Sequence, residues 1–324
     1  MMDPDSSSDR PLVDVGVVSW NTAELTADAL RRLLDTDQGC AVRLLVRDNA
    51  SVDGTPELLR KRVPEAEVDA GSENLGFAAG VNTLIARSTA PWLLLLNSDA
   101  WPEPGAIGRL LQAAQAQPRA AAVAPRLERP DGSLEHSTFP FPSLRIATIM
   151  AFARRRISHQ RADELMLEDD WEHDRARPVD WAVGAALLLR REALLAVGGL
   201  DESFFMYVED LEWCWRAARN GWEIWFEPSA VVRHVGNASG AQRYGERRTR
   251  IYMANTYRFY RREHGVVAAV AYRGLNLAGS SIRYLAARRA GDSDLAHYWR
   301  IQMAANVAPS GDRRSRRGAG HEPV

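Results

Sequence analysis

Short apolar runs alternate with helically periodic segments through the first hundred residues of this chain. Strands are predicted at residues 13–20, 42–46, 66–70 and 92–96. Between them, 25–34 and 78–86 carry apolar side chains at the spacing of one helical face, and a turn at 51–56 leads into another helix. Strands that alternate with helices form right-handed βαβ units. The pattern therefore predicts an α/β fold with a mostly parallel sheet flanked by helices.

The pattern becomes less regular after Pro102. The predicted elements are a helix at 105–117, a strand at 120–126, a hairpin turn at Asp131-Gly132, a long apolar strand at 179–190, helices at 192–197 and 211–220, and strands at 222–226 and 230–234. Residues 144–177 are charged and partly helical, and we expect 163–174 to be mobile. Beyond Arg243 the chain is helical and rich in arginine.

Composition and charge exclude several classes of protein. The chain has 324 residues and a formal net charge of -1, so no overall charge attracts nucleic acid, and we expect no nucleic-acid partner. The 2 cysteines, Cys40 and Cys214, form no metal-binding spacing, and residues 1–11 do not resemble a signal peptide. No apolar run reaches the roughly 20 residues that span a bilayer. These features predict a cytoplasmic protein.

Two short acidic segments, called here the two acidic stations, contain the candidate catalytic and metal-binding residues. The apolar run 93–96 ends on Asn97-Ser98-Asp99, which places a carboxylate at the carboxyl edge of the sheet, where open α/β folds bind ligands. The aromatic stretch 204–208 leads into the acidic pair Glu209-Asp210. A carboxylate among aromatic side chains can act as a general base with a tuned pKa. Together the two stations indicate transfer of a group from an activated nucleotide donor.

Seven motifs in order resemble one family. They are Val18-Ser19-Trp20-Asn21, the run from Asp48 to Thr55, the run from Asn74 to Asn82, Asn97-Ser98-Asp99, Phe205-Met206-Tyr207-Val208-Glu209-Asp210, Gly221-Trp222 and Arg233-His234. This series resembles the family 2 glycosyltransferases of GT-A fold, in particular their rhamnosyltransferase-like branch. The resemblance covers about 12–240, and it implies a nucleotide-binding half at 12–101 and an acceptor and catalytic half at 102–240. We expect a helical extension at 241–308 and disorder at 1–11 and 309–324.

The resemblance implies a set of donor-binding residues. Ser19, Asn21, Asp48, Asn74, Gly76, Gly80, Asn82, Asn97, Ser98 and Asp99 would bind the nucleotide sugar. Asp48 would accept a hydrogen bond from the ring N–H of a pyrimidine, or it caps the next helix instead. Glycine permits close approach of the backbone to ribose and diphosphate, although asparagine can equally fix such a loop locally. Asp53-Gly54-Thr55 is more typical of a structural turn.

The acidic motif departs from the family pattern. The family has Asp-x-Asp, whereas this chain has Asn97 in place of the first acid. The resemblance implies that Asp99 binds Mg²⁺ or Mn²⁺, which bridges the two phosphates, and that His234 completes the metal site. The alternatives are that Asp99 caps a helix before Pro102 and that His234 is an ordinary polar residue.

The resemblance places the catalytic base on the second acid of the pair, Asp210. It would remove the proton of the acceptor hydroxyl as that oxygen attacks the anomeric carbon. Glu209 could compete for this role, and both acids also suit the positive end of the helix that follows. Trp181 and Gly184 are expected to border the sugar pocket with Glu209, although Trp181 could equally lie in the core.

These expectations define an inverting, metal-dependent glycosyltransferase. Its predicted donor is dTDP-rhamnose, or else another UDP- or GDP-sugar, and its acceptor is a cell-envelope glycan or a polyprenyl-linked sugar. Arginines of the C-terminal helices could touch the inner face of an anionic membrane, or they form a solvated helical face: Arg261, Arg262, Arg273, Arg283, Arg288 and Arg289. A sugar nucleotidyltransferase would need a basic glycine-rich phosphate loop, which is absent. An inactive glycan-binding domain would not need both Asp99 and Asp210.

Overall fold

The computed structural model describes residues 13–167, 171–236 and 247–309. The chain divides into two compact units. The first comprises Met1–Phe139 and Glu172–Ser239, and the second comprises Pro140–Trp171 and Gly240–Val324. The segment 140–171, which the sequence assigns to the larger domain, thus belongs with the C-terminal helices. The ends predicted to be disordered fall on 1–12 and 310–324, which lie outside the described residues.

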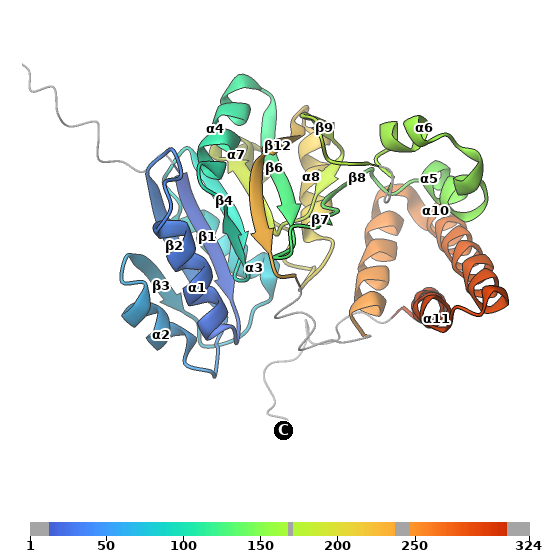
Figure 1. The fold of residues 1–324 in the computed structure, drawn as a ribbon, viewed down its shortest axis with the longest axis horizontal. Coiled ribbons are helices and arrows are strands. Elements are labelled where there is room, and N and C mark those ends of the chain that lie inside the picture. Colours follow the sequence, from blue (N-terminus) through green and yellow to red (C-terminus); the bar gives the residue numbers. More distant parts are fainter. Residues whose placement is uncertain (1–12, 168–170, 237–246, 310–324) are drawn as a thin grey trace, which may run out of the picture. The chain divides into compact units, whose positions relative to one another are not determined.

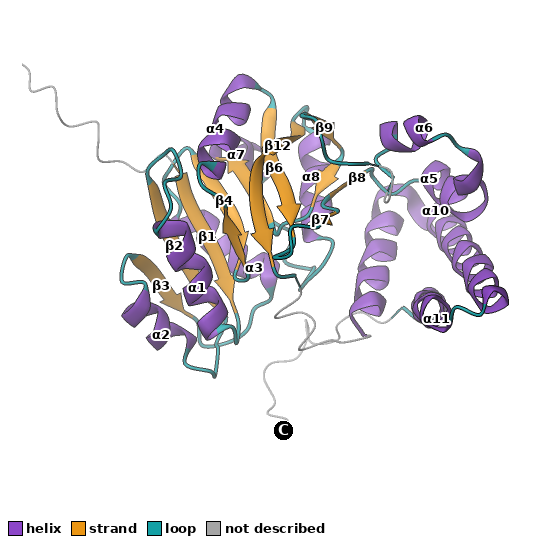
Figure 2. Ribbon diagram, in the orientation of Figure 1, coloured by secondary structure: helices purple, strands orange, loops and turns teal. Residues whose placement is uncertain are grey.

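A ten-stranded sheet forms the centre of the first unit (Figures 1 and 2). Its main path runs β3 (Ala66–Ala70), β2 (Val42–Asp48), β1 (Val13–Ser19), β4 (Trp92–Asn97), β11 (Ala186–Arg190), β6 (Ala120–Glu128), β12 (Glu223–His234) and β5 (Ala100–Pro102). Strand β7 (Leu134–Glu135) pairs with β6, and β9 (Arg177–Val179) pairs with β12. A separate small sheet contains β8 (Thr138–Phe139) and β10 (Trp181–Ala182).

Strand direction confirms the predicted α/β fold. Strands β3, β2, β1 and β4 are parallel, and β6 and β12 run in the same direction because β11 is antiparallel to both β4 and β6. The flanking helices are α1 (Ala23–Leu34), α2 (Thr55–Arg62), α3 (Phe77–Arg87), α4 (Ala106–Ala116), α7 (Arg191–Val197) and α8 (Glu209–Arg219). The sheet is therefore mostly parallel, with the antiparallel strand β11 in its middle and the short antiparallel strands β5, β7 and β9 paired with β6 or β12.

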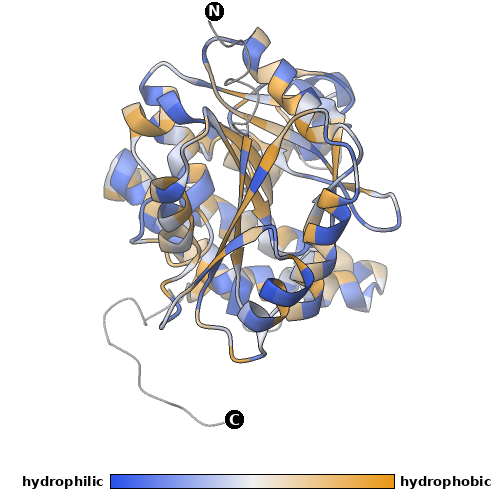
Figure 3. Ribbon diagram, turned by 90° about the vertical axis from the view of Figure 1, so that its left-hand side faces the viewer, coloured by the Kyte–Doolittle hydropathy of each residue, from blue (hydrophilic) through white to orange (hydrophobic). Residues whose placement is uncertain are grey.

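Apolar strands explain how the core forms. Strand β4 is buried from Trp92 to Leu96, as expected for a strand covered on both faces. In Figure 3 the central strands are largely orange, whereas the surrounding helices carry many blue positions. Helix α3 approaches β1 closely, because a Cβ on Gly80 would lie 2.9 Å from a methyl group of Val18. Close packing of this kind fixes the strand ends on which the site is built.

The amino end of the sheet contains a buried ion pair. Asp14 is fully buried on β1 and binds the Arg43 guanidinium through two hydrogen bonds of 2.8 Å. Ser88 and the backbone N–H groups of Thr89 and Ala90 also donate to it. Burial would raise the pKa of Asp14, but these donors outweigh it and lower the pKa. The pair therefore stabilises the sheet at the end opposite to the candidate site.

Two of three local predictions are wrong in detail, and the third is confirmed. The single strand predicted at 179–190 is wrong, because the chain forms β9, β10 and β11 with a break at Gly184. The two strands predicted at 222–226 and 230–234 are one strand, β12, whose pairing with β6 is irregular between Glu227 and Val231. The hairpin at Asp131-Gly132 is confirmed by the pairing of β6 with β7.

The mobility expected of segment 163–174 stays a prediction, but its described part contains helix and buried side chains. Helix α6 (His159–Glu164) extends into it, and the side chains of Trp171 and His173 are buried. Residues 168–170 lie outside the described part of the chain. Burial of two large aromatic side chains anchors this segment, although its charged composition indicated mobility.

The second unit is helical, as predicted. It contains α5 (Leu144–Thr148), a π-helix (Ile149–Ala153), a 3₁₀ turn (Arg154–Arg156), α6, α10 (Arg247–Ala290) and α11 (Ser293–Val307). Helix α10 is kinked at Gly265, where φ is 84°. Its two parts are joined to α11 by Tyr257, whose hydroxyl bonds Asn306, and by Arg273, which donates to the Asn306 and Val307 carbonyls. Across the described ranges, none of the helices has both the length and the apolar character needed to cross a membrane.

Candidate active site

Polar side chains gather where β1, β2 and β4 end. Ser19 lies opposite Asp48 in the register of β1 and β2, and Val18 lies opposite Asn97 in that of β1 and β4. The carboxyl ends of these parallel strands therefore bring Ser19, Asp48 and Asn97 to one edge of the sheet. This edge is where open α/β sheets bind their ligands, as the sequence predicts.

Asp48 is held firmly by its neighbours. Its carboxylate accepts hydrogen bonds from the Ser19 hydroxyl, the Ser51 hydroxyl and the Ser51 backbone N–H, at 3.1, 2.6 and 2.9 Å. Its side chain is buried. Asn21 joins the same loop, because its side-chain oxygen accepts from the Val52 N–H and its own N–H donates to Ser51. Asp48 and Asn21 thus order the loop after β2, and their contact with a nucleotide stays a prediction.

The next predicted motif, from Asn74 to Asn82, makes mainly internal contacts. The Asn74 side-chain oxygen accepts from the Gly76 N–H, which is the local role considered as the alternative. Gly76 has a φ of 90°, and a Cβ there would lie 2.5 Å from the carbonyl oxygen of Phe205. The Phe77 N–H donates to that same oxygen at 2.8 Å. Glycine is required here for close approach to the chain itself, before any approach to a diphosphate.

Asn97, Asp99 and His234 come together as predicted. His234 Nε2 lies 3.2 Å from the Asn97 amide nitrogen and 3.3 Å from an oxygen of Asp99. The other ring nitrogen, Nδ1, lies 2.9 Å from Glu135 on β7. Burial would lower the pKa of His234, but the two carboxylates outweigh it and raise the pKa to about 9. Ser98 is buried beside them and accepts from the Thr22 hydroxyl.

Asp99 and His234 offer a carboxylate and an imidazole to a cation. Among the described residues, no three or more His, Cys, Asp or Glu side chains are arranged to hold a metal ion together. Glu135 contacts Nδ1 of the imidazole, whereas Asp99 contacts Nε2, so Glu135 cannot share an ion with Nε2. It can instead orient the ring, as carboxylates commonly do for metal-binding histidines. Asp99 and His234 thus offer one carboxylate and one imidazole, and they suit a cation whose other ligands come from phosphate and water.

Asp210 lies at the start of α8 and close to the Asn97 motif. Its carboxylate accepts from the Gly184 N–H at 2.9 Å and from the Leu211 N–H at 2.8 Å. The residue after Gly184, Ala185, accepts from the Asn97 N–H at 2.9 Å. Two consecutive residues at the break before β11 therefore connect the two acidic stations. Burial raises the pKa of Asp210 despite these two donors.

The loop that delivers Asp210 is strained. Tyr207 and Val208 have φ values of 69° and 81°, which residues with side chains rarely adopt, least of all a β-branched one. Each such conformation costs about 1–3 kcal/mol and tends to occur at functional sites. It turns the chain sharply from the aromatic stretch into α8. Glu209 is buried behind this turn, with an Oε2 that has no hydrogen-bond partner among the described residues.

The environment of Glu209 differs from that of Asp210. Burial, followed by the charge of Asp210, raises the pKa of Glu209 to about 8. Asp210 is only partly buried and its carboxylate has two hydrogen-bond donors. At neutral pH Glu209 is therefore mostly protonated, while Asp210 is the better candidate to accept a proton.

Aromatic residues form a wall near Gly184. Trp181 is buried and stacks on Phe139, with ring centroids 4.9 Å apart, which agrees with the alternative of a core position. His136 contacts both Phe139 and His173 edge to face. The sequence did not predict that Glu135, His136 and His173 lie near the site, because none of them belongs to a recognisable motif. Glu135 and His136 lie at the hairpin of β6 and β7, whereas His173 comes from the segment before β9 and reaches them only in the folded chain.

Comparison with known proteins agrees with this geometry. Residues 14–165 match the family described as Glycosyl transferase family 2. The N-acetylglucosaminyl-diphospho-decaprenol L-rhamnosyltransferase of Mycobacterium tuberculosis is 35% identical over 215 residues, which cover 61% of this chain and 68% of that protein. The rhamnosyltransferase WbbL of Escherichia coli is 27% identical over 85 residues, or 26% of this chain and 32% of that one.

A solved structure supports the fold. The mannosyltransferase PcManGT of Pyrobaculum calidifontis, in complex with GDP-mannose and Mn²⁺, has a TM-score of 0.58 at 18% identity, over 94% of this chain and 88% of that one. The likeness at this identity concerns the fold alone. The order of the motifs, the strand-end site and the mycobacterial relative together lead to one conclusion: the chain is a glycosyltransferase of family 2, of the rhamnosyltransferase-like type.

Proposed function

We propose that this enzyme transfers a sugar from a nucleoside diphosphate sugar with inversion, and that Asp210 is its general base. The carboxylate of Asp210 takes the proton of the acceptor hydroxyl while that oxygen bonds to the anomeric carbon. The bond from this carbon to the diphosphate breaks, and the nucleoside diphosphate leaves with the electron pair. The observation that supports the proposal is the pair of backbone N–H groups, from Gly184 and Leu211, that fix the Asp210 carboxylate beside the Asn97 motif.

Asp210 is preferred over Glu209 on physical grounds. Two backbone N–H groups donate to the Asp210 carboxylate, whereas Glu209 is buried with an Oε2 that has no hydrogen-bond partner among the described residues, and burial raises the pKa of Glu209 to about 8. The pKa of Asp210 is also raised, which brings a carboxylate closer to the value that suits proton transfer near neutrality. The same donors hold its oxygens in one orientation. Glu209 would instead act as a neutral neighbour that keeps the local charge low.

We expect Asp210→Asn to abolish transfer while it leaves nucleotide binding nearly unchanged. The amide has the same shape but cannot take up a proton, and loss of a general base costs roughly 10²–10⁴ in turnover. Turnover should be measured by product formation and nucleotide affinity by calorimetry. Glu209→Gln is the matched control and should lose far less turnover. If the two variants lose equally, or if Glu209→Gln loses more, the base is not Asp210.

We further propose that a divalent cation, Mg²⁺ or Mn²⁺, binds between Asp99, His234 and the donor diphosphate. A cation there would supply neutralisation of the charge on the departing diphosphate. Asp99 would contribute a carboxylate oxygen and His234 its Nε2, while Glu135 holds the ring from the other side. Asn97 contributes less charge than an acid at that position would. The cation would therefore depend more on the diphosphate for its ligands.

Asp99→Ala should remove the enhancement that metal gives to nucleoside diphosphate binding. We would titrate nucleoside diphosphate into the enzyme with Mn²⁺ and again with chelator. The wild type should bind more tightly with Mn²⁺, and the variant should bind equally in both conditions. Asp28→Ala removes an exposed carboxylate on α1 and is the control. Metal enhancement retained in Asp99→Ala would show that Asp99 is not a ligand.

The proposed donor is a dTDP-sugar, with dTDP-rhamnose favoured. The mycobacterial relative, named as an L-rhamnosyltransferase, supports rhamnose. Asp48 supports a pyrimidine, because a carboxylate accepts from the ring N–H of thymine or uracil. It already accepts three hydrogen bonds, and a carboxylate has room for about four, so one acceptor position remains.

A competition assay with dTDP, UDP, GDP and ADP should rank the pyrimidines first. Adenine presents no ring N–H on the edge that Asp48 reads, and an unpaired buried acceptor costs about 1–3 kcal/mol. Asp48→Asn should reduce the preference, whereas Asp53→Asn, in the neighbouring structural turn, should keep it. Tight GDP binding would contradict the dTDP assignment. An unchanged preference in Asp48→Asn would leave Asp48 with its loop-ordering role alone.

The proposed acceptor is a lipid-linked sugar or a cell-envelope glycan, reached by contact with the inner face of the cell membrane. The mycobacterial relative is named for a diphospho-decaprenol acceptor. Three valines follow the kink of α10 and are largely exposed, at 64% for Val266, 86% for Val267 and 66% for Val270. Arg258 and Arg261 are exposed just before them. Apolar side chains next to cations fit the surface of an anionic bilayer.

We expect the enzyme to sediment with phosphatidylglycerol vesicles and to bind phosphatidylcholine vesicles much less. Val267→Asp should weaken the binding at least tenfold, since a charge replaces an inserted side chain. Leu195→Asp is the matched control, because Leu195 is 76% exposed but lies in the first unit. Equal binding by wild type and Val267→Asp would exclude this surface as the membrane contact.

A further inference from the structure

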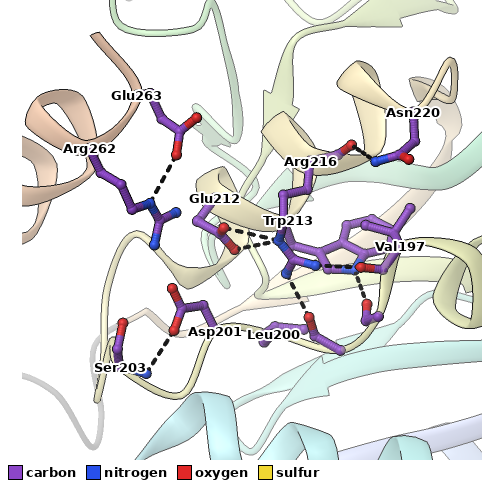
Figure 4. A network of polar contacts seen from close by, with 12 residues as sticks. Val197, Leu200, Asp201, Ser203, Glu212, Trp213, Arg216, Asn220, Arg262 and Glu263 are labelled. Carbon is purple, nitrogen blue, oxygen red and sulfur yellow. Dashed lines mark hydrogen bonds and ion pairs between the residues drawn. The ribbon is translucent and has the colours of Figure 1, made fainter. Parts of the chain in front are cut away.

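The turn that follows α7 presents a row of backbone carbonyl groups to α8. Helix α7 ends at Val197, and Gly198 continues the chain with a φ of 86°. The guanidinium of Arg216 donates to the Val197 oxygen at 2.7 Å and to the Gly199 oxygen at 2.6 Å. The indole N–H of Trp213 donates to the Gly198 oxygen at 2.9 Å (Figure 4). Three consecutive carbonyl groups are therefore bound by side chains of the helix that carries Asp210.

Glu212 fixes the orientation of this guanidinium. Its two carboxylate oxygens lie 2.9 and 3.0 Å from Arg216 Nε, on the same face of α8. The Glu212 side chain is almost fully buried, at 3% exposure. With Nε bound to Glu212, both terminal nitrogens point at the turn (Figure 4). A lysine could not make these contacts together, because it lacks the planar fork of donors.

The same turn is also bound by α3. The Asn82 side chain accepts from the Leu200 N–H at 2.8 Å and donates to the Leu200 oxygen at 2.9 Å. Its nitrogen also donates to Glu202 at 2.8 Å. A Cβ at Gly199 would collide with the Asn82 amide, so glycine lets α3 approach closely. The amide of Asn82 is thus fully engaged with the protein, although the sequence predicted a contact with the donor.

The amino end of α3 also binds the loop that leads into α8. There the Phe77 N–H binds the Phe205 carbonyl oxygen, just before the strained turn that leads to Asp210. The two helices are therefore connected at two separate levels. One is the hydrogen bond from the Phe77 N–H to the Phe205 carbonyl oxygen. The other is the turn at 197–200, which is bound by Asn82 and Arg216.

We propose that Asn82 and Arg216 are positioning residues for Asp210. By binding consecutive residues of the 197–200 turn, Arg216 at Val197 and Gly199 and Asn82 at Leu200, they set the distance between α3, which begins at the proposed donor loop, and α8, which begins at the proposed base. This inference rests on the proposed function of Asp210. A change at either residue lets α8 shift and loosens the contact of Asp210 with the Gly184 N–H, more than 20 residues away in sequence.

The simpler role for Arg216 is to cap the end of α7. Helix ends leave carbonyl groups unpaired, and a cation there stabilises the helix. A cap alone would affect stability but not the rate or the pH dependence of the reaction. The two hydrogen bonds of Asn82 with Leu200, which lies beyond the end of α7, have no part in such a cap. The two roles therefore differ in what they predict for turnover.

The test compares Asn82→Ala and Arg216→Lys with Asn220→Ala. Asn220 lies at the end of α8, and its side chain donates to the Arg216 carbonyl oxygen at 2.8 Å (Figure 4). We would measure kcat, the donor KM and the pH dependence of kcat for each full-length variant. Hydrogen exchange at the Gly184 amide would be measured in the same proteins without substrate.

Asn82→Ala and Arg216→Lys should each lower kcat about 10- to 100-fold, the scale expected for a displacement near 1 Å, with donor KM within about threefold of wild type. Loss of the Gly184 donor disfavours the charged carboxylate, so the acidic limb of the kcat profile should move to higher pH. The Gly184 amide should exchange faster in both variants. Asn220→Ala should match wild type in all three measurements.

Two results would overturn the proposal. One is lower thermal stability in both variants with kcat, pH profile and Gly184 exchange unchanged, which would leave only a structural cap. The other is a weaker donor KM in Asn82→Ala with kcat preserved, which would make Asn82 a donor ligand. If wild type transferred no sugar from any nucleotide donor, the proposed function would fail, but Gly184 exchange would still decide whether the two residues hold Asp210.

Discussion

The hydrogen bond from the Gly184 amide to the Asp210 carboxylate is the contact on which the site depends. The sheet makes this bond available because the apolar run 179–190 is broken into separate strands, so that the Gly184 N–H is not used in a strand ladder. The adjacent Ala185 carbonyl accepts from Asn97. One short break thus fixes the proposed base against the strand end that carries Asp99.

Unfavourable local features around Asp210 are offset by stabilising contacts on both sides of it. Tyr207 and Val208 adopt backbone conformations that cost about 1–3 kcal/mol each. Burial of Glu209 adds a carboxyl group whose Oε2 lacks a hydrogen-bond partner in the described part of the chain. Such a turn persists because the residues on both sides are held: Phe205 by α3 and the rest of α8 by the 197–200 turn. The rigid frame therefore stabilises a local structure that is unfavourable by itself.

Much of this arrangement could be predicted from the sequence, because strand ends carry regular signals. The apolar run before Asn97 and the helix after Asp210 both have the predicted type, and parallel pairing brings Ser19, Asp48 and Asn97 to one edge. The break at Gly184 could not be predicted, since a buried apolar run has the same composition whether or not it is interrupted. Nor could Glu135, because its partner His234 lies 99 residues away and only the hairpin brings them together.

Inversion at the anomeric carbon can be tested without knowledge of the natural acceptor. A single carboxylate base at Asp210 implies one direct displacement at the anomeric carbon, and one displacement inverts its configuration. The decisive measurement is the anomeric configuration of the transferred sugar, read by nuclear magnetic resonance from the product formed with a nucleotide sugar of known configuration. The account predicts a product of opposite configuration to the donor. A product that retains the donor configuration would contradict it, because retention requires a second displacement or a different mechanism.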